Sequence, residues 1–167
     1  SPDGAEYYAY RVRSFTTTDM TPDEVHNLGL SEVARIRAEM EEVAASAGYD
    51  TREAYIEHLR TDPQYYMTDA DEYVAYAQAL AKEIDGWMPK LETGAAGIYR
   101  INTTELDQRP LWELPALGVH EAVPGHHHQI ALQQELDIHP LRANGTFFTA
   151  FVEGWGLYSE RLGIEMG

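Results

Sequence analysis

The first half of the chain alternates amphipathic segments with short polar breaks, a pattern typical of a helical protein. Residues 21–24 (Thr-Pro-Asp-Glu) predict a helix start, because threonine can cap, proline suits the first turn and glutamate completes a capping box. Gly29 is expected to interrupt this helix, and a longer one should follow, with Ser31 as its cap and Gly48 at its end. The predicted buried face of the longer helix has helical spacing: Val33, Ile36, Met40, Val43 and Ala47.

Two further helices and one strand are predicted before the middle of the chain. Thr51 should begin a helix that ends near Arg60, and Asp69 should begin another that runs to about Trp87. The second helix carries a face at helical spacing: Tyr73, Tyr76, Leu80 and Ile84. Residues 98–103 (Ile-Tyr-Arg-Ile-Asn-Thr) form the best strand candidate. We therefore expect a mainly α-helical fold with a small β-strand element, in a single domain over residues 1–167.

Apolar residues in the second half predict a central helix, followed after a break by further helical segments. In the last predicted helix, Glu153 and Gly156 are three residues apart and therefore share a face. Small residues at Gly154 and Gly156 would permit close approach to the central helix. Such close packing is needed if two helices are to share one ligand site.

Composition and charge narrow the classes of partner. A chain of 167 residues with 44% hydrophobic and 24% charged residues suits one globular domain. Twelve basic against 28 acidic residues give a formal net charge of −16, which disfavours nucleic acids and anionic membranes. No apolar run approaches the roughly 18 residues that span a bilayer, and residues 1–10 lack the features of a signal peptide. The absence of cysteine excludes disulfides and thiolate zinc sites and leaves the compartment open, cytoplasmic or exported.

Residues 118–129 (Gly-Val-His-Glu-Ala-Val-Pro-Gly-His-His-His-Gln) concentrate groups that bind metals or move protons, including four of the seven histidines. A hydrolytic zinc ion takes neutral imidazoles and a carboxylate as ligands and leaves one position open for water. A further carboxylate outside the ligand set takes the proton of that water. With Glu153 in a later segment, these residues indicate a zinc site that hydrolyses amide bonds, although another divalent ion remains an alternative.

The spacing of the histidines leaves two ligand pairs open. His120 and His126 are six residues apart, about 600° along a straight helix, so they would point about 120° away from each other. Pro124 and Gly125 can deform the helix between them and turn His126 towards the metal. His127, at about 700°, is the natural partner in an unbroken helix and ranks second.

The two motifs together resemble a known family. His-Glu-x-x-Pro-Gly-His-x-x-Gln at 120–129, followed by Glu-Gly-Trp-x-Leu-Tyr at 153–158, is similar to the bacterial family called domain of unknown function 885. That family is grouped with zinc metallopeptidases of the gluzincin type, and the likeness extends over most of the chain. The resemblance implies His120, His126 and Glu153 as the ligands of one Zn²⁺ and Glu121 as the general base. It also implies a zincin-like helical metallopeptidase core, of which this chain is a part, because family members continue well beyond the Glu-Gly-Trp helix.

Several other residues are candidates for secondary roles. Tyr158 and His127 could donate to the charge that develops on the substrate. Gln129, or a carboxylate, could orient the imidazoles. Tyr99 and Asn102 could hold the substrate backbone along the predicted strand.

Three interpretations of function follow. The first is a zinc-dependent peptidase that acts on a peptide or small amide. The second is a non-catalytic helical binding module, or an inactive remnant of a peptidase. The third is a zinc hydrolase of a non-peptide ester or amide. Metal analysis separates the first from the second, whereas only a substrate screen separates the first from the third.

Overall fold

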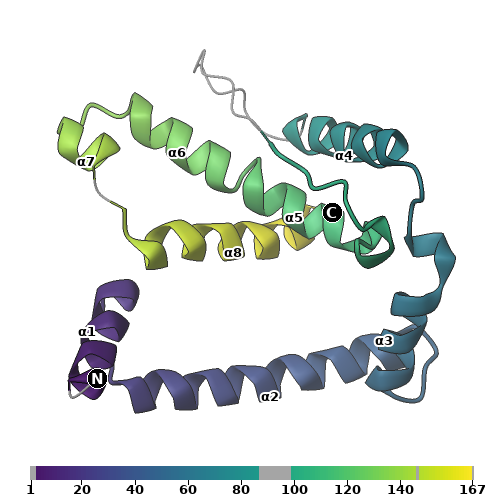
Figure 1. The fold of residues 1–167 in the computed structure, drawn as a ribbon, viewed down its shortest axis with the longest axis horizontal. Coiled ribbons are helices and arrows are strands. Elements are labelled where there is room, and N and C mark those ends of the chain that lie inside the picture. Colours follow the sequence, from purple (N-terminus) through teal and green to yellow (C-terminus); the bar gives the residue numbers. More distant parts are fainter. Residues whose placement is uncertain (1–2, 87–98, 146, 167) are drawn as a thin grey trace. The chain divides into compact units, whose positions relative to one another are not determined.

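The computed structural model describes residues 3–86, 99–145 and 147–166, and all regular structure within them is helical (Figure 1). The predicted helical class is therefore confirmed. The chain divides into two compact units, Ser1–Asp62 and Pro63–Gly167, which are described separately below. The single domain over residues 1–167 stays a prediction. None of the helices in the described part of the chain has the length and apolar character that crossing a membrane requires.

The first unit consists of α1 (Gly4–Thr16), α2 (Pro22–Ser46) and α3 (Arg52–Thr61). The predicted capping box is confirmed, because Thr21 Oγ1 accepts from the Glu24 amide at 3.2 Å and Glu24 Oε2 accepts from the Thr21 amide at 2.8 Å. The predicted interruption at Gly29 is wrong, since α2 continues through it. A mid-helix glycine costs only about 1 kcal/mol, which a capped helix of 25 residues tolerates. Ser31 donates to the Leu28 carbonyl inside the helix instead of capping.

The predicted buried face of α2 is also wrong. Ala47 is exposed, and the four large residues of this face are between 38% and 56% exposed: Val33, Ile36, Met40 and Val43. Within the first unit α2 contacts α1 near its N-terminal end and α3 near its C-terminal end (Figure 1), and Ala44 is the buried residue of the helix. An amphipathic pattern predicts which face of a helix can be buried, but burial requires an element that covers that face.

Other predicted helix boundaries are confirmed. Gly48, at φ 86°, follows the end of α2. Thr51 caps α3 through a bond that its side chain accepts from the Ala54 amide at 3.2 Å. Asp69 caps α4 (Ala70–Asp85), because its side chain accepts hydrogen bonds from the amides of Asp71 and Glu72. Trp87, the predicted end of α4, lies outside the described residues.

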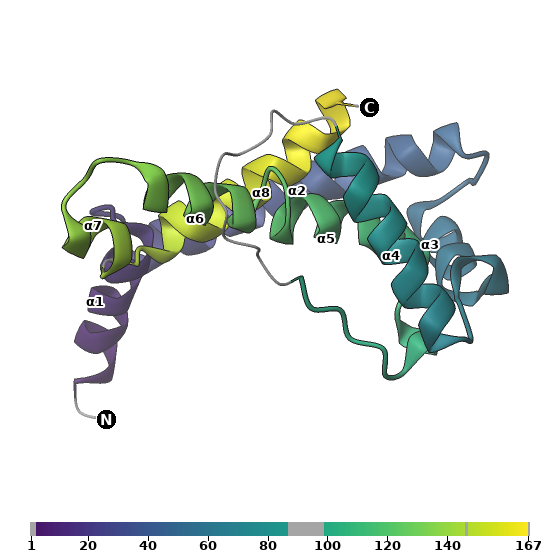
Figure 2. The same ribbon diagram turned by 90° about the horizontal axis from the view of Figure 1, so that it is seen from above.

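The second unit contains α4 together with α5 (Leu114–Glu121), α6 (His126–Glu135), α7 (Pro140–Asn144) and α8 (Thr149–Met166). Its described residues also form three short 3₁₀ turns: η1 (Pro63–Tyr65), η2 (Leu106–Gln108) and η3 (Leu111–Glu113). Helices α5 and α6 follow one another along α8, and α4 packs against α5 (Figures 1 and 2).

A small apolar core holds α4 to α5. Tyr73, Ala77 and Leu114 form its buried centre. Partly buried residues pack around them: Met67, Leu80, Ile101, Leu106 and Leu111. Ile84 is buried as predicted, but Tyr76 is 40% exposed, so the predicted apolar face of α4 holds at only some of its positions. The core fixes α5, which carries the first candidate ligand.

The predicted strand is wrong for residues 99–103, which form no regular structure, while Ile98 lies outside the described residues. Strand propensity requires a neighbouring strand to pair with, and no strand occurs elsewhere in the described ranges. Asn102 instead makes a local turn, in which its Oδ1 accepts from the Thr104 amide and hydroxyl, both at 2.9 Å. Ile101 packs on the apolar core.

Candidate metal centre

The helix that carries His120 ends before His126. The predicted deformation between the two histidines is therefore confirmed, and it is a complete break in the helix. Helix α5 ends at Glu121 and α6 begins at His126. Gly125 lies so close to the last turn of α5 that an added Cβ would sit 1.8 Å from the His120 carbonyl oxygen. Because backbone atoms cannot yield to a side chain at that distance, glycine is required there. The break lets α6 start in a new direction.

Helix α8 holds this break from the opposite side. Trp155 Nε1 donates to the Pro124 carbonyl at 2.7 Å. Gln129, which is buried, donates from Nε2 to the Phe151 carbonyl at 3.1 Å. These two bonds tie the Glu-Gly-Trp segment to the histidine segment, so each motif positions the other.

The first histidine lies directly against the backbone of α8. A Cβ added to Gly156 would come within 2.6 Å of His120 Cε1 and 2.7 Å of its Nε2. The missing side chain of Gly156 therefore makes the space that the imidazole occupies. Glu153, three residues earlier on the same helix, is brought to the same side.

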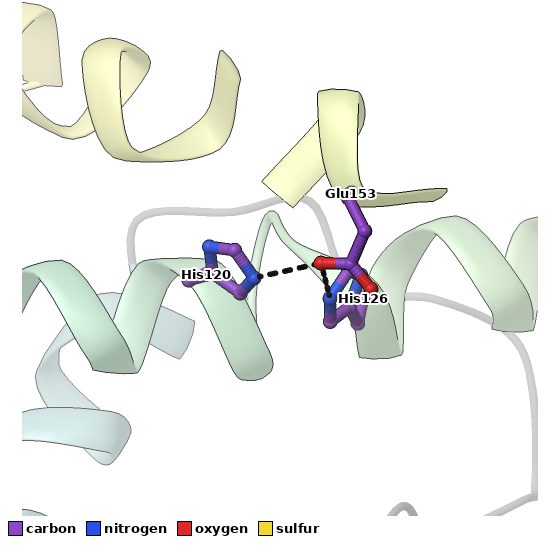
Figure 3. Close-up of side chains that lie close together, drawn as sticks. All are labelled: His120, His126 and Glu153. Atoms are coloured by element: carbon purple, nitrogen blue, oxygen red, sulfur yellow. Dashed lines mark ion pairs between the residues drawn. The ribbon is translucent and has the colours of Figure 1, made fainter. Parts of the chain in front are cut away.

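His120, His126 and Glu153 come together into one group (Figure 3). Glu153 Oε2 lies 3.7 Å from His120 Nε2 and 3.6 Å from His126 Nε2. The two rings are nearly perpendicular, at 88°, with centroids 4.7 Å apart. Two ligands on a tetrahedral zinc ion with bonds of about 2.0–2.1 Å are about 3.3 Å apart, so small adjustments would bring these atoms to a metal.

Exposure of the group suits a site that also admits water. The side chains of His120 and His126 are 17% and 16% exposed, whereas that of Glu153 is 52% exposed. Two imidazole nitrogens and one carboxylate oxygen form a common ligand set for hydrolytic zinc, which keeps a further position open. The residues present therefore fit a zinc ion.

The other predicted site residues are not members of this group. Glu121 is exposed at the end of α5, and His127 is half-buried on α6 beside His126. Tyr158 is 54% exposed, with its ring 5.6 Å from that of Trp155. Gln129 bonds a backbone carbonyl, and Asn102 is occupied by its own turn. Burial, and secondarily His127, lowers the pKa of the neighbouring His128.

The charge of Glu121, the predicted general base, acts on the side chain of Tyr99. Its hydroxyl is buried and has no hydrogen-bond partner among the described residues. Burial raises the pKa of Tyr99, and the charges of Tyr73 and Glu121 raise it further. The phenol therefore stays protonated at neutral pH, as a donor within electrostatic range of the Glu121 carboxylate.

One residue at the site was not singled out by the sequence. Glu160 Oε1 lies 2.6 Å from His120 Nδ1, on the side of the ring opposite Glu153. The available signal was spacing, because Glu160 follows Glu153 by seven residues, about two helical turns, and shares its face with Gly156. A carboxylate among the orienting groups was expected, but its identity was left open.

Comparison with known proteins agrees with both motifs. The family model described as "Bacterial protein of unknown function (DUF885)" matches residues 1–96 and 88–167. The chain belongs to the DUF885 family. No curated protein matches the chain. A solved structure, described as "the putative lipoprotein from Colwellia psychrerythraea", matches with a TM-score of 0.86 and 30% identity. The match covers 100% of this chain and 35% of that one, so the chain spans about a third of its length.

Loss of the Trp155 hydrogen bond should lower both the stability of the protein and its affinity for zinc. Trp155→Phe keeps an aromatic ring but leaves the Pro124 carbonyl without its donor, which should cost about 1–3 kcal/mol of unfolding free energy. Zinc affinity should fall with it, because the break between α5 and α6 loses its support. Chemical denaturation and zinc titration measure both effects. Trp112→Phe, at an exposed position, is the control, and an equal response of the two variants would contradict the expectation.

Proposed function

We propose that this chain carries the metal centre of a zinc-dependent hydrolase that cleaves amide bonds in a peptide or small amide. The observation that carries the proposal is the convergence of His120, His126 and Glu153, from three helices, on one point. A zincin-like catalytic domain that includes this chain is part of the same proposal. When bound, the divalent ion would supply Lewis acidity, which acidifies water and polarises a carbonyl.

Glu121 is the proposed general base. It follows the ligand His120 directly and is exposed, so its carboxylate is available to a water molecule and to substrate. It would take the proton of the attacking water and return it to the leaving amine, which is the usual task of a carboxylate beside such a ligand set. In this assignment Glu121 does not bind the metal, and unlike Glu160 it has no contact with His120 Nδ1 that would occupy its carboxylate.

A donor for the oxygen of the scissile carbonyl is the second requirement. Tyr99 is the favoured candidate, because its protonated hydroxyl has no partner among the described residues and senses the charge of Glu121. Tyr158 and His127 are the alternatives from the sequence motifs. Tyr99 would have to turn towards the substrate, since its hydroxyl is buried.

Metal content and a substrate screen test the proposal together. The purified protein should hold about one zinc per chain after dialysis, and His126→Ala should lose it. Hydrolysis of peptides in a mixed library, compared with ester and non-peptide amide panels, then separates the remaining functions. Zinc without turnover of any panel supports the binding module or inactive remnant. Turnover of esters or non-peptide amides alone supports the third interpretation, and a protein without zinc contradicts the centre itself.

A further inference from the structure

The two nitrogens of His120 face two different carboxylates. Nδ1 lies 2.6 Å from Glu160 Oε1, and Nε2 lies 3.7 Å from Glu153 Oε2. The first distance is that of a strong charge-assisted hydrogen bond, whereas the second is too long for one and leaves room for an ion. The ring therefore has one side committed to a partner and one side directed into the candidate metal centre.

The short contact determines where the ring carries its hydrogen. An ionised carboxylate only accepts hydrogen bonds, so Nδ1 must donate to Glu160. A neutral imidazole has one N–H, and Nε2 is then left with its lone pair towards Glu153 and His126. The lone pair on Nε2 is the form that a metal ligand requires.

The surroundings commit Glu160 to this contact. Its side chain is 35% exposed and lines a cavity of about 660 Å³ whose wall is mostly apolar, with Leu80, Trp112 and Val119 among the lining residues. Within the described ranges Glu160 forms no ion pair with lysine or arginine. The hydrogen bond from His120 is thus the side-chain contact that stabilises its carboxylate, with no competing lysine or arginine among the described residues.

We propose that Glu160 is the positioning residue of the metal centre, which holds His120 in the Nδ1–H tautomer and presents Nε2 to the ion. This role rests on the metal centre of the proposed function but not on the amide-bond chemistry. Glu160 itself contacts neither metal nor substrate.

Zinc affinity and the tautomer of His120 provide separate readouts. Glu160→Leu should lower zinc affinity about 10- to 100-fold, the usual effect of losing such a partner. Glu160→Gln keeps an oxygen acceptor but loses the charge, so its affinity should lie between those of the parent and the leucine variant. Competition with a chromophoric chelator measures each dissociation constant on the purified protein. Glu83→Gln is the matched control, since Glu83 lines the same cavity and the same charge is removed.

Nitrogen-15 spectra of the histidines in the metal-free protein test the mechanism directly. The parent and Glu160→Gln should show His120 with its hydrogen on Nδ1, whereas Glu160→Leu should show a mixture or the Nε2–H form. A merely structural ion pair would change the unfolding midpoint but not the ordering of tautomers and affinities.

Three results would overturn the proposal, in two distinguishable ways. If the parent binds zinc and Glu160→Leu binds it equally well, or if His120 keeps its tautomer in Glu160→Leu, the positioning role is wrong and the metal centre stands. If the parent binds no zinc, the metal centre and the role of Glu160 both fall.

Discussion

Glu121→Gln should lower hydrolysis by at least about 100-fold while zinc content stays at the level of the parent. Glutamine has the size of glutamate and can still form hydrogen bonds, but it cannot accept the proton of the attacking water. Glu121 is exposed at the end of α5 and lies outside the group formed by His120, His126 and Glu153, so its replacement should leave the ligands in place. Turnover is measured with the substrate that the screen identifies, and zinc by elemental analysis.

Glu113→Gln is the matched control for this experiment. Glu113 is an exposed acidic residue immediately before α5, and its replacement changes the net charge by the same amount. Its turnover should equal that of the parent. Equal turnover by Glu121→Gln and parent, at equal zinc content, would remove Glu121 from the mechanism. Loss of zinc in Glu121→Gln would assign it a structural role instead.

Gly156→Ala should lower zinc affinity by about tenfold or more, because the new Cβ would lie 2.6–3.0 Å from three atoms of the His120 ring. The ring must move away from α8, and that movement shifts Nε2 relative to His126 and Glu153. Alanine is the better helix former by about 1 kcal/mol, so part of the stability lost to the clash is restored. We therefore expect Gly156→Ala to lower zinc affinity more, in free-energy terms, than it lowers the free energy of unfolding.

Gly154→Ala separates the clash from the change in helix propensity. Gly154 lies on the same helix, two residues away, and a Cβ there would meet nothing within 4 Å. This variant should bind zinc like the parent and unfold at the same or a higher denaturant concentration. If both variants bind zinc equally well, the packing of His120 against Gly156 has no part in the centre.

Local features of the fold could be predicted because they depend on neighbours in the sequence. The cap at Thr21 needs only Glu24, three residues away, and the turn at Gly48 needs only a residue that tolerates positive φ. The break after Glu121 belongs to the same class, since proline and glycine act on the turn that contains them. The predicted interruption at Gly29 is wrong because it considers only the local free-energy cost of a glycine within a helix. The stability of a long capped helix outweighs that cost.

Features that require a distant partner could not be predicted in this way. The pattern of α2 predicts a buried apolar face, yet no described element of its unit covers that face. Residues 99–103 likewise have no strand beside them within the part of the chain that the structure describes. Periodicity states what a segment can do in contact with another segment. It does not state which other segment will be there.

The candidate site divides along the same line. The sequence by itself supplied the candidate donors and the break between them: spacing left His126 and His127 both open as partners of His120, the family resemblance favoured His126 with Glu153, and Pro124 and Gly125 predicted the deformed helix. Only the tertiary structure decided that Glu153 Oε2 lies close to both Nε2 atoms and that Glu160 contacts the opposite nitrogen of His120, Nδ1. The physical reason is distance along the chain. Atoms 40 residues apart meet through the packing of α5 on α8, made possible by the absent side chain of Gly156.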